Sequence, residues 1–256
     1  MDREEIQNEL YSTPYHHLPF EAEGVWWISQ SLDWGYKYLA ILTNVVELVC
    51  ASGPNASHPL RVLDFGCGDG RLIKELLRSC PDIVTLVGVD HSDQALAFAR
   101  AWTWGNGRVH LFRRLTDVDE RFLPVQTVVA MEVLEHIPPS DLEKTVQSLS
   151  EILGVNGHLI VSVPTTNVSV NPKHYQHFTW TTLSQVTSKF FTPVTCRYIH
   201  RQGWFAEILR RAVVNRWWVA NSPAWLKLMS NLYRRFVGRA TEATGTHIIA
   251  VFRVLS

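Results

Sequence analysis

Short apolar runs alternate with helical patterns through the middle of the chain. Val62, Leu63 and Phe65 form a run typical of a buried parallel strand. Apolar residues at positions 72, 73, 76 and 77 then mark one face of a helix over residues 71–79. The alternation continues, with strands predicted over 83–89, 109–112, 126–131 and 158–163 and helices over 92–102 and 141–153. This order predicts an α/β fold with a mostly parallel, doubly wound sheet.

The last third of the chain departs from this alternation. A helix over 179–190 and a strand over 193–200 are followed by two basic, aromatic helical patterns, over 204–220 and 223–240. A final apolar strand covers 246–254. We interpret residues 203–245 as a helical insertion before the last strand. It could wall a substrate cleft, pair with another subunit or lie on a membrane surface, and a plain amphipathic cover for the sheet edge is favoured.

The first 57 residues precede the alternating core. An irregular segment rich in aromatic residues and proline leads into a helical pattern over 26–50, and a linker pattern follows at 51–57. We therefore predict one domain over 1–256: an N-terminal helical or lid segment at 1–57, a core at 58–202 plus 246–256, and the insertion. A chain of 256 residues is long enough for one such core.

The composition is that of an ordinary globular protein, with 46% hydrophobic and 19% charged residues. The net charge of zero hides an asymmetry. Residues 1–172 hold 12 Lys and Arg against 22 Asp and Glu, whereas residues 173–256 hold 12 Lys and Arg against 2 Glu. This distribution predicts either an anionic partner for the C-terminal part (a phosphate, a carboxylate, nucleic acid or a lipid surface) or the packing of the two parts against each other.

The cysteines at 50, 67, 80 and 196 are scattered and form no C-x-x-C pair. We expect no disulfide framework, no zinc site and a reducing compartment. No apolar segment follows the charged N-terminus, and no apolar run approaches the length of a membrane span. The expected location is therefore cytoplasmic, with peripheral membrane attachment left open.

A glycine-rich turn connects the first core strand to its helix. Gly66, Gly68 and Gly70 alternate with other residues, so the backbone can turn sharply and a ligand can approach it closely. A strand, a glycine turn and a helix N-terminus suit a nucleotide-like ligand. Twenty residues later the next strand ends at Asp90, whose carboxylate can bind both hydroxyls of a ribose. The alternative is a glycine loop of another α/β protein, with Asp90 only capping the next helix.

The string D-x-G-x-G-x-G that begins at Asp64 resembles motif I of the class I S-adenosylmethionine-dependent methyltransferases. The resemblance implies a Rossmann-like fold with a mostly parallel seven-stranded sheet and helices on both faces. It also implies S-adenosylmethionine as cofactor and S-adenosylhomocysteine as product, with Asp64 and the loop amides at the methionyl end and Asp90 at the ribose. The cofactor-binding residues expected from it are Asp64, Phe65, Gly66, Cys67, Gly68, Gly70, Asp90, His91 and Glu132.

A second group of chemically active residues follows the strand over 126–131. Glu132, Glu135 and His136 would share one face if a helical turn began there. Two carboxylates and an imidazole at a strand end suit Mg²⁺ or a similar divalent cation. His174 and His177 arrive after the strand over 158–163, and either could complete the site. The alternative without a metal has His136 facing the methyl donor or capping a helix.

The string E-x-x-E-H resembles that of the quinone-biosynthesis O-methyltransferases and, more weakly, of the Hen1-like RNA ribose 2′-O-methyltransferases. In both groups the motif is associated with a divalent metal near the acceptor hydroxyl. In the Hen1-like register the metal-binding histidine would fall on Gln176 rather than His177. The catalytic residues expected from these motifs are His136, Glu135 and Glu132, and the conditional metal ligands are Glu132, Glu135, His136 and His177.

These observations predict S-adenosylmethionine-dependent methyl transfer to a hydroxyl of a small-molecule acceptor, such as a natural product, a quinone, a sugar or a lipid-linked compound. The alternatives are RNA ribose 2′-O-methylation, less favoured because no RNA-binding module is evident, and a cofactor-binding scaffold without activity. A monomer or homodimer is expected. The candidate substrate-binding residues are Tyr15, His16, His17, His174, His177 and Trp217, although a plain surface pair is the favoured interpretation of His16 and His17.

Overall fold

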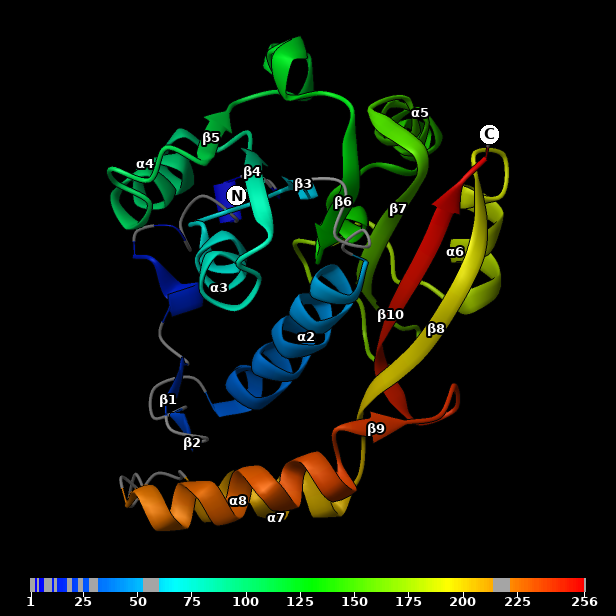
Figure 1. Ribbon diagram of the computed structural model, residues 1–256. Helices are drawn as coiled ribbons and strands as arrows, with labels where there is room; N and C mark the ends of the chain where they lie inside the picture. The colour runs from blue at the N-terminus through cyan, green and yellow to red at the C-terminus, as the bar shows by residue number, and fades with distance from the viewer. Residues whose placement is uncertain are drawn as a thin grey trace.

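The computed structural model describes residues 3, 5–6, 11, 13–17, 20–22, 25–27, 32–52, 60–213 and 222–255. Its centre is an eight-stranded sheet with the order β5-β4-β3-β6-β7-β10-β8-β9 (Figure 1). Strands β5 to β7 run parallel, while β10 is antiparallel to both β7 and β8. The strands of this sheet are β3 (Leu60–Phe65), β4 (Ile83–Val89), β5 (Val109–Phe112), β6 (Val125–Met131), β7 (Leu153–Pro164), β8 (Phe191–Arg201), β9 (Arg239–Ala240) and β10 (Gly245–Val254).

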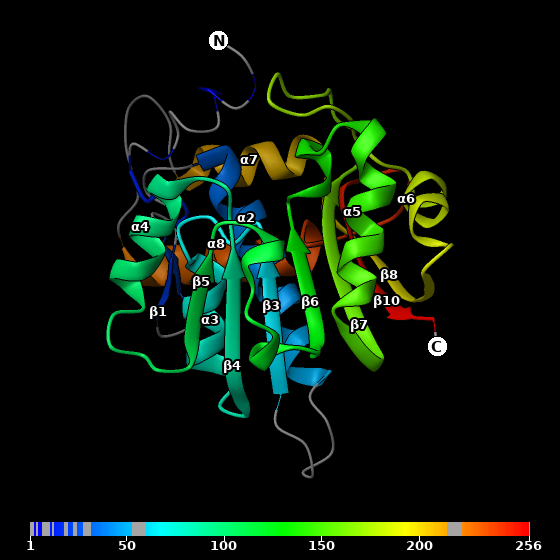
Figure 2. The ribbon, with the colours of Figure 1, turned by 90° about the horizontal axis from the view of Figure 1, so that it is seen from above.

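Helices cover both faces of the sheet, as Figure 2 shows for α5 on one side and for α2 and α3 on the other. Val62 and Leu63 are neighbours in β3, yet both are fully buried and belong to different hydrophobic clusters, one on each face. This is the pattern of a parallel strand covered on both sides. The helices are α2 (Leu32–Ala51), α3 (Arg71–Ser79), α4 (Asp93–Trp102), α5 (Pro139–Glu151), α6 (Trp180–Thr187), α7 (Trp204–Val213) and α8 (Pro223–Phe236).

The predicted βα alternation is confirmed, with small shifts in the later elements. Helix α4 begins after Ser92, whose hydroxyl accepts a hydrogen bond from the Ala95 amide at 3.3 Å, as its N-cap position predicts. Strand β7 begins at Leu153 rather than at residue 158 because Leu153 pairs with Val125 of β6. Helix α5 therefore ends at Glu151, earlier than the expected residue 153.

Two predictions for the flanking segments are wrong. The helix expected from residue 26 begins at Leu32, because residues 20–22 and 25–27 form the antiparallel hairpin of β1 (Phe20–Ala22) and β2 (Val25–Trp27). The second helix of the insertion ends at Phe236 rather than at residue 240, because Ala240 pairs with Tyr198 at the sheet edge. This pairing adds an eighth strand to the seven expected. Residues 214–221, which include Trp217, lie outside the described residues.

Cys50 and Cys80 form a disulfide, with their Cα atoms 5.4 Å apart, so the prediction that the cysteines are not cross-linked is wrong. The bond joins the last turn of α2 to the residue that follows α3. These two positions are separated by 30 residues and meet because α2 and α3 pack side by side on the same face of the sheet. Their spacing in the sequence carries no sign of that packing. Cys67 and Cys196 are free.

Among the described residues, no helix is both long enough and apolar enough to cross a membrane.

Candidate active site

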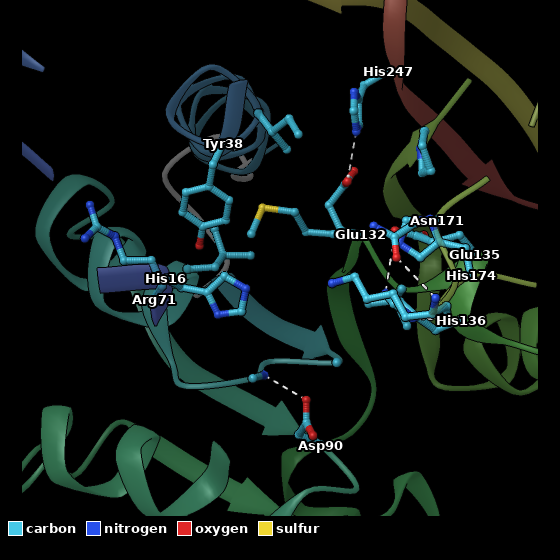
Figure 3. Close-up of a pocket in the computed structure, with 18 of the residues that line it drawn as sticks. His16, Tyr38, Arg71, Asp90, Glu132, Glu135, His136, Asn171, His174 and His247 are labelled. Carbon is cyan, nitrogen blue, oxygen red and sulfur yellow. Dashed lines mark hydrogen bonds and ion pairs between the residues drawn. The ribbon is translucent and has the colours of Figure 1, made fainter. Parts of the chain in front are cut away.

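A cavity of about 500 Å³ opens where β3, β4 and β6 end, which is where an open α/β sheet binds its ligands. The glycine loop and Asp90 form one wall, and the chain that follows β6 forms the opposite wall (Figure 3). Helix α2 contributes Lys37, Tyr38 and Ile41 to the lining. The two motifs found in the sequence therefore face each other across a single cavity.

The glycine loop has the backbone conformation for which its glycines were predicted. Gly66, Gly68 and Gly70 have φ of 77°, 53° and 79°, in the left-handed region that residues with a Cβ rarely adopt. A Cβ on Gly66 would collide with the Val133 side chain, and one on Gly68 would lie 2.7 Å from the Tyr11 hydroxyl. The loop amides at Gly66, Cys67, Gly68 and Gly70 all donate hydrogen bonds within the protein. These four amides are therefore not free to donate to a ligand, and the contribution of the glycines is to let a ligand lie close to the backbone.

Asp90 is held rigidly at the end of β4. One carboxylate oxygen accepts a hydrogen bond from the Gly68 amide at 2.8 Å, and the other accepts one from the Ser92 amide at 2.9 Å. The helix that follows is capped by Ser92, so Asp90 is not merely a cap. The exposed His91 follows it at the rim of the cavity. This places a carboxylate beside the glycine loop, as expected for a group that binds ribose hydroxyls.

Asp64 is 2% exposed, and its Oδ2 atom has no hydrogen-bond partner among the described residues. Burial, and then the nearby Asp90 carboxylate, raise the pKa of Asp64 to about 8. An unpartnered buried carboxyl is costly unless a ligand satisfies it. Because Asp64 lines the cavity, a cationic ligand group such as an ammonium fits this position.

His16 and His17 are not a plain surface pair, contrary to the favoured interpretation of the sequence. The His16 ring nitrogen Nδ1 lies 3.1 Å from Asp69 Oδ1, and the His16 amide donates to Asp69 Oδ2 at 3.1 Å. The His17 ring stacks on Trp102 with centroids 4.4 Å apart. Burial opposes ionisation of Asp69, yet hydrogen bonding and charge from His16 lower its pKa overall. The N-terminal segment is thereby attached to the glycine loop.

The same segment also reaches the opposite wall of the cavity. The Arg3 guanidinium donates to the His174 carbonyl at 3.3 Å and lies 4.5 Å from the centre of the Tyr175 ring. Arg3, Tyr11 and His16 all line the cavity, whereas His17 does not. The backbone of Tyr15 belongs to the short helix Tyr15–His17, and its side chain lies outside the described residues.

Glu132 does not begin a helical turn, so the condition under which Glu132, Glu135 and His136 would share one helical face is not met. Its φ of 58° turns the chain, and the short helix that follows covers only Leu134–His136. The Glu132 side chain instead accepts a hydrogen bond from Ser162 at 2.8 Å and lies 3.0 Å from His247 Nε2. Burial opposes ionisation of Glu132, but His247 and Ser162 lower its pKa overall. The Glu132 carboxylate thus already has partners in Ser162 of β7 and His247 of β10.

Sequence reasoning missed the partners of Glu132. His247 is 2% exposed and lies within an otherwise apolar final strand. A lone histidine in such a run is the one signal that could have revealed it. Lys37 and Lys173 were also missed, although both line the cavity and contribute positive charge beside Glu132 and Glu135.

Glu135, His136 and His174 form the cluster that the second motif predicted in part. Ligand atoms of all three lie within 4.8 Å of one another. Glu135 is fully buried, neither of its oxygens has a hydrogen-bond partner among the described residues, and burial and then Glu132 raise its pKa well above the usual range. Burial lowers the pKa of His136 to about 4 and that of His174 to about 3. Both imidazoles are therefore neutral at pH 7.

This cluster differs from the expected metal site. His177 lies behind His174, with His174 Nδ1 and His177 Nε2 2.9 Å apart, and its other ring nitrogen faces the Val168 carbonyl at 3.1 Å. Glu132 is paired with His247. One carboxylate and two neutral imidazoles would suit a transition metal better than Mg²⁺, which prefers oxygen ligands.

Comparison with known proteins identifies the family. A family model described as a methyltransferase domain matches residues 41–212. The chain therefore belongs to this family, and it is a class I S-adenosylmethionine-dependent methyltransferase in fold and motif. A ubiquinone biosynthesis O-methyltransferase of Azorhizobium caulinodans is 34% identical over 108 residues, which are 40% of this chain and 40% of that protein. The match thus spans less than half the length of that relative.

Solved structures share the fold at low sequence identity. The N-methyltransferase NodS of Bradyrhizobium japonicum, in complex with S-adenosylhomocysteine, has a TM-score of 0.58 and 14% identity, over 96% of this chain and 98% of NodS. The methyltransferase domain of a bacterial Hen1, CtHen1-C, has a TM-score of 0.54 and 19% identity, over 84% of this chain and 97% of that domain. At these identities the similarity shows the fold alone.

Proposed function

We propose that this protein transfers the methyl group of S-adenosylmethionine to a hydroxyl of a small-molecule acceptor, with His136 as the proton acceptor. The observation that carries the proposal is the placement of a neutral histidine in the cavity wall opposite the glycine loop and Asp90. A cofactor bound at one wall and a proton acceptor at the other are what methylation of a hydroxyl requires.

The first wall fits the cofactor. Asp90 would bind the ribose hydroxyls, and the unpartnered Oδ2 of Asp64 would receive the amino group of the methionyl end. Gly66 and Gly68 would allow the cofactor to lie against the backbone. Bound S-adenosylmethionine supplies a methyl group that its sulfonium already makes electrophilic. The remaining work of the protein is to align the acceptor with the S–CH₃ bond and to exclude water.

The second wall fits removal of the hydroxyl proton. His136 Nδ1 lies 3.2 Å from the Lys173 carbonyl, an arrangement in which Nδ1–H donates and Nε2 is left to accept a proton. His136 Nε2 would take the proton of the acceptor hydroxyl as that oxygen bonds to the methyl carbon and the S–CH₃ bond breaks, which would leave S-adenosylhomocysteine as the second product. Arg3, Tyr11 and His16 close the N-terminal side of the cavity, which helps to exclude water.

The choice of oxygen over nitrogen rests on the partial match to a ubiquinone biosynthesis O-methyltransferase and on the neutral base, because a neutral amine needs no base before it attacks. Incubation with S-adenosylmethionine and separate panels of phenols, sugars, amines and short RNAs, read by mass shift, tests the proposal. We expect methylation of one hydroxyl compound and a loss of about 10²–10⁴ in kcat/KM for His136→Ala. His158→Gln, on the same sheet but outside the cavity, is the matched control.

Methylation of amines alone, or of RNA alone, would contradict the proposed acceptor class. Equal activity of His136→Ala and the native protein on a hydroxyl acceptor would contradict the proposed base while leaving the methyltransferase itself intact.

A further inference from the structure

The helices α7 and α8 present apolar side chains to solvent as well as to the protein. On α7, Trp204 is 75% exposed and Ile208, one helical turn later, is 51% exposed. On α8, Trp225, Leu228 and Phe236 are between 41% and 47% exposed and follow one another at spacings of three and eight residues. Positions so spaced lie along one stripe of a helix. We call these five residues the apolar stripe.

The inward face of α8 is a separate surface, which is buried against the rest of the protein. Leu226, Met229, Tyr233 and Val237 are buried, and the Tyr233 ring stacks on Tyr36 of α2 with centroids 4.9 Å apart. A helix pair that only covered the rest of the protein would expose a polar outer surface. The apolar stripe lies on the exposed side of the helix pair, so burial of the inward face of α8 does not account for it.

Positive charge surrounds the apolar stripe. The exposed side chains of Lys227, Arg234, Arg235 and Arg239 lie on or next to α8, and Arg201 precedes α7. Between residues 201 and 240 the sequence contains a single acid, Glu207, and Arg211 neutralises it at 2.7 Å. These five cations make up half of the basic excess of residues 173–256.

A second cavity, of about 450 Å³, lies at the end of the helix pair where α7 begins and α8 ends. Trp204, Phe205 and Phe236 line it, with Arg201 beside them. The Phe205 and Phe236 rings meet edge to face with centroids 5.4 Å apart, so the two helices are joined at this point. An apolar hollow with a cation at its margin fits the boundary between acyl chains and anionic headgroups.

We propose that the outer face of α7 and α8 docks this protein on the surface of an anionic lipid bilayer. Tryptophan, phenylalanine and leucine next to Lys and Arg are the combination by which helices lie in the membrane interface. The charge of the face is complementary to that of anionic headgroups, and each cation near such a surface adds to the affinity.

Docking would place the active-site cavity close to the lipid. Figure 1 shows the helix pair at one end of the molecule, directly beyond α2. Tyr36 of α2 contacts α8, while Lys37 and Tyr38 of the same helix line the cavity. A single helix therefore separates the docking face from the site of the chemistry.

Sedimentation with vesicles tests the docking face. Vesicles of phosphatidylcholine with about one quarter phosphatidylglycerol should carry the native protein down at low salt, and binding should weaken as salt rises. Replacing Lys227, Arg234 and Arg235 by Gln should lower the partition coefficient by on the order of 100-fold. The matched control replaces Arg113, Arg114 and Arg121 by Gln and should bind as the native protein does, because these exposed residues belong to the segment between β5 and β6, which Figure 1 shows at the end of the molecule away from α7 and α8.

The apolar contribution is tested in the same assay. Trp204→Ser with Leu228→Ser should reduce binding at least tenfold, since both side chains would leave the interface. Trp104 and Val155 are 90% and 86% exposed elsewhere on the surface, so Trp104→Ser with Val155→Ser is the control and should change nothing. Circular dichroism and melting curves would verify that each variant is folded.

Three results would overturn the proposal: no binding to anionic vesicles, equal binding to vesicles of phosphatidylcholine alone, or equal loss in the control variants. Sedimentation velocity could give a fourth result that overturns the proposal. A homodimer that dissociates when Trp204 and Leu228 are replaced would assign the face to a second copy of the chain.

Discussion

Glu132 Oε2 lies 3.0 Å from His247 Nε2, and this contact joins the end of β6 to β10, although β7 lies between these two strands in the sheet. It separates Glu132 from the cluster of Glu135, His136 and His174, although Glu132 still lines the same cavity. The pair therefore changes which residues can take part in proton transfer or metal binding.

The contact between Glu132 and His247 should contribute strongly to stability. His247→Phe removes the histidine partner of the largely buried Glu132 carboxylate, leaves it with the Ser162 hydroxyl, and should lower the free energy of unfolding by about 3 kcal/mol. Adding Glu132→Gln should recover part of that loss, which a double-mutant cycle by urea unfolding would measure. Strictly additive losses would mean that the two side chains do not interact.

Glu132 should also contribute to acid sensitivity. Its pKa in the folded protein lies below its ordinary value of 4.5, so its contribution is complete above about pH 4.5 and is lost as the pH falls toward the folded pKa. Glu132→Gln should be less stable than the native protein at pH 7 but should lose less stability between pH 5 and pH 3. A parallel fall of the two stability curves across that interval would contradict the assignment.

Glu135 should behave in the opposite way. Its folded pKa is raised above 4.5, so it costs no stability at low pH and costs increasingly more as the pH rises above 4.5. Glu135→Gln should therefore be more stable than the native protein at pH 7 and equal to it near pH 3.5, as urea unfolding would show. A variant that is less stable at pH 7 only when a divalent metal is present, with the difference abolished by EDTA, would instead identify Glu135 as a metal ligand.

The glycine loop should control cofactor affinity. Gly66→Ala adds a Cβ against Val133 at a φ of 77° and should weaken S-adenosylhomocysteine binding by at least tenfold in calorimetry. Gly105 has a φ of 75° with nothing within 4 Å of its Cβ position, so Gly105→Ala carries the same backbone cost without the collision. Equal affinities in the two variants would remove Gly66 from the cofactor site.

The contact of Asp69 with His16 and His17 should hold the N-terminal segment in place. Asp69→Asn removes the charge that faces both imidazoles, so limited proteolysis at pH 7 should cut within the first 20 residues several times faster. Asp82→Asn, at an exposed carboxylate outside the cavity, is the control. Unchanged cleavage in Asp69→Asn would show that other contacts hold the segment.

The sequence by itself determined the parallel core and the cavity wall that the glycine loop and Asp90 form. Strand and helix periods, the Ser92 cap and the alternating glycines are local signals, because each depends on residues within one or two turns of one another. The glycine motif and Asp90 lie at the ends of adjacent strands, so the βαβ order alone placed them together. In the structure the Gly68 amide donates a hydrogen bond to Asp90, so the two ends of these strands are in direct contact.

Only the tertiary structure decided the cavity wall that follows β6 and the contacts between distant parts of the chain. Glu132 meets His247, His16 meets Asp69, and Cys50 meets Cys80 through elements that approach from distant parts of the chain. The left-handed backbone at Glu132 breaks the helical turn on which a shared face depended, and the loop after β7 brings His174 rather than His177 into the cluster with Glu135. Such contacts depend on how helices and strands pack in three dimensions, and no spacing along the chain encodes that packing.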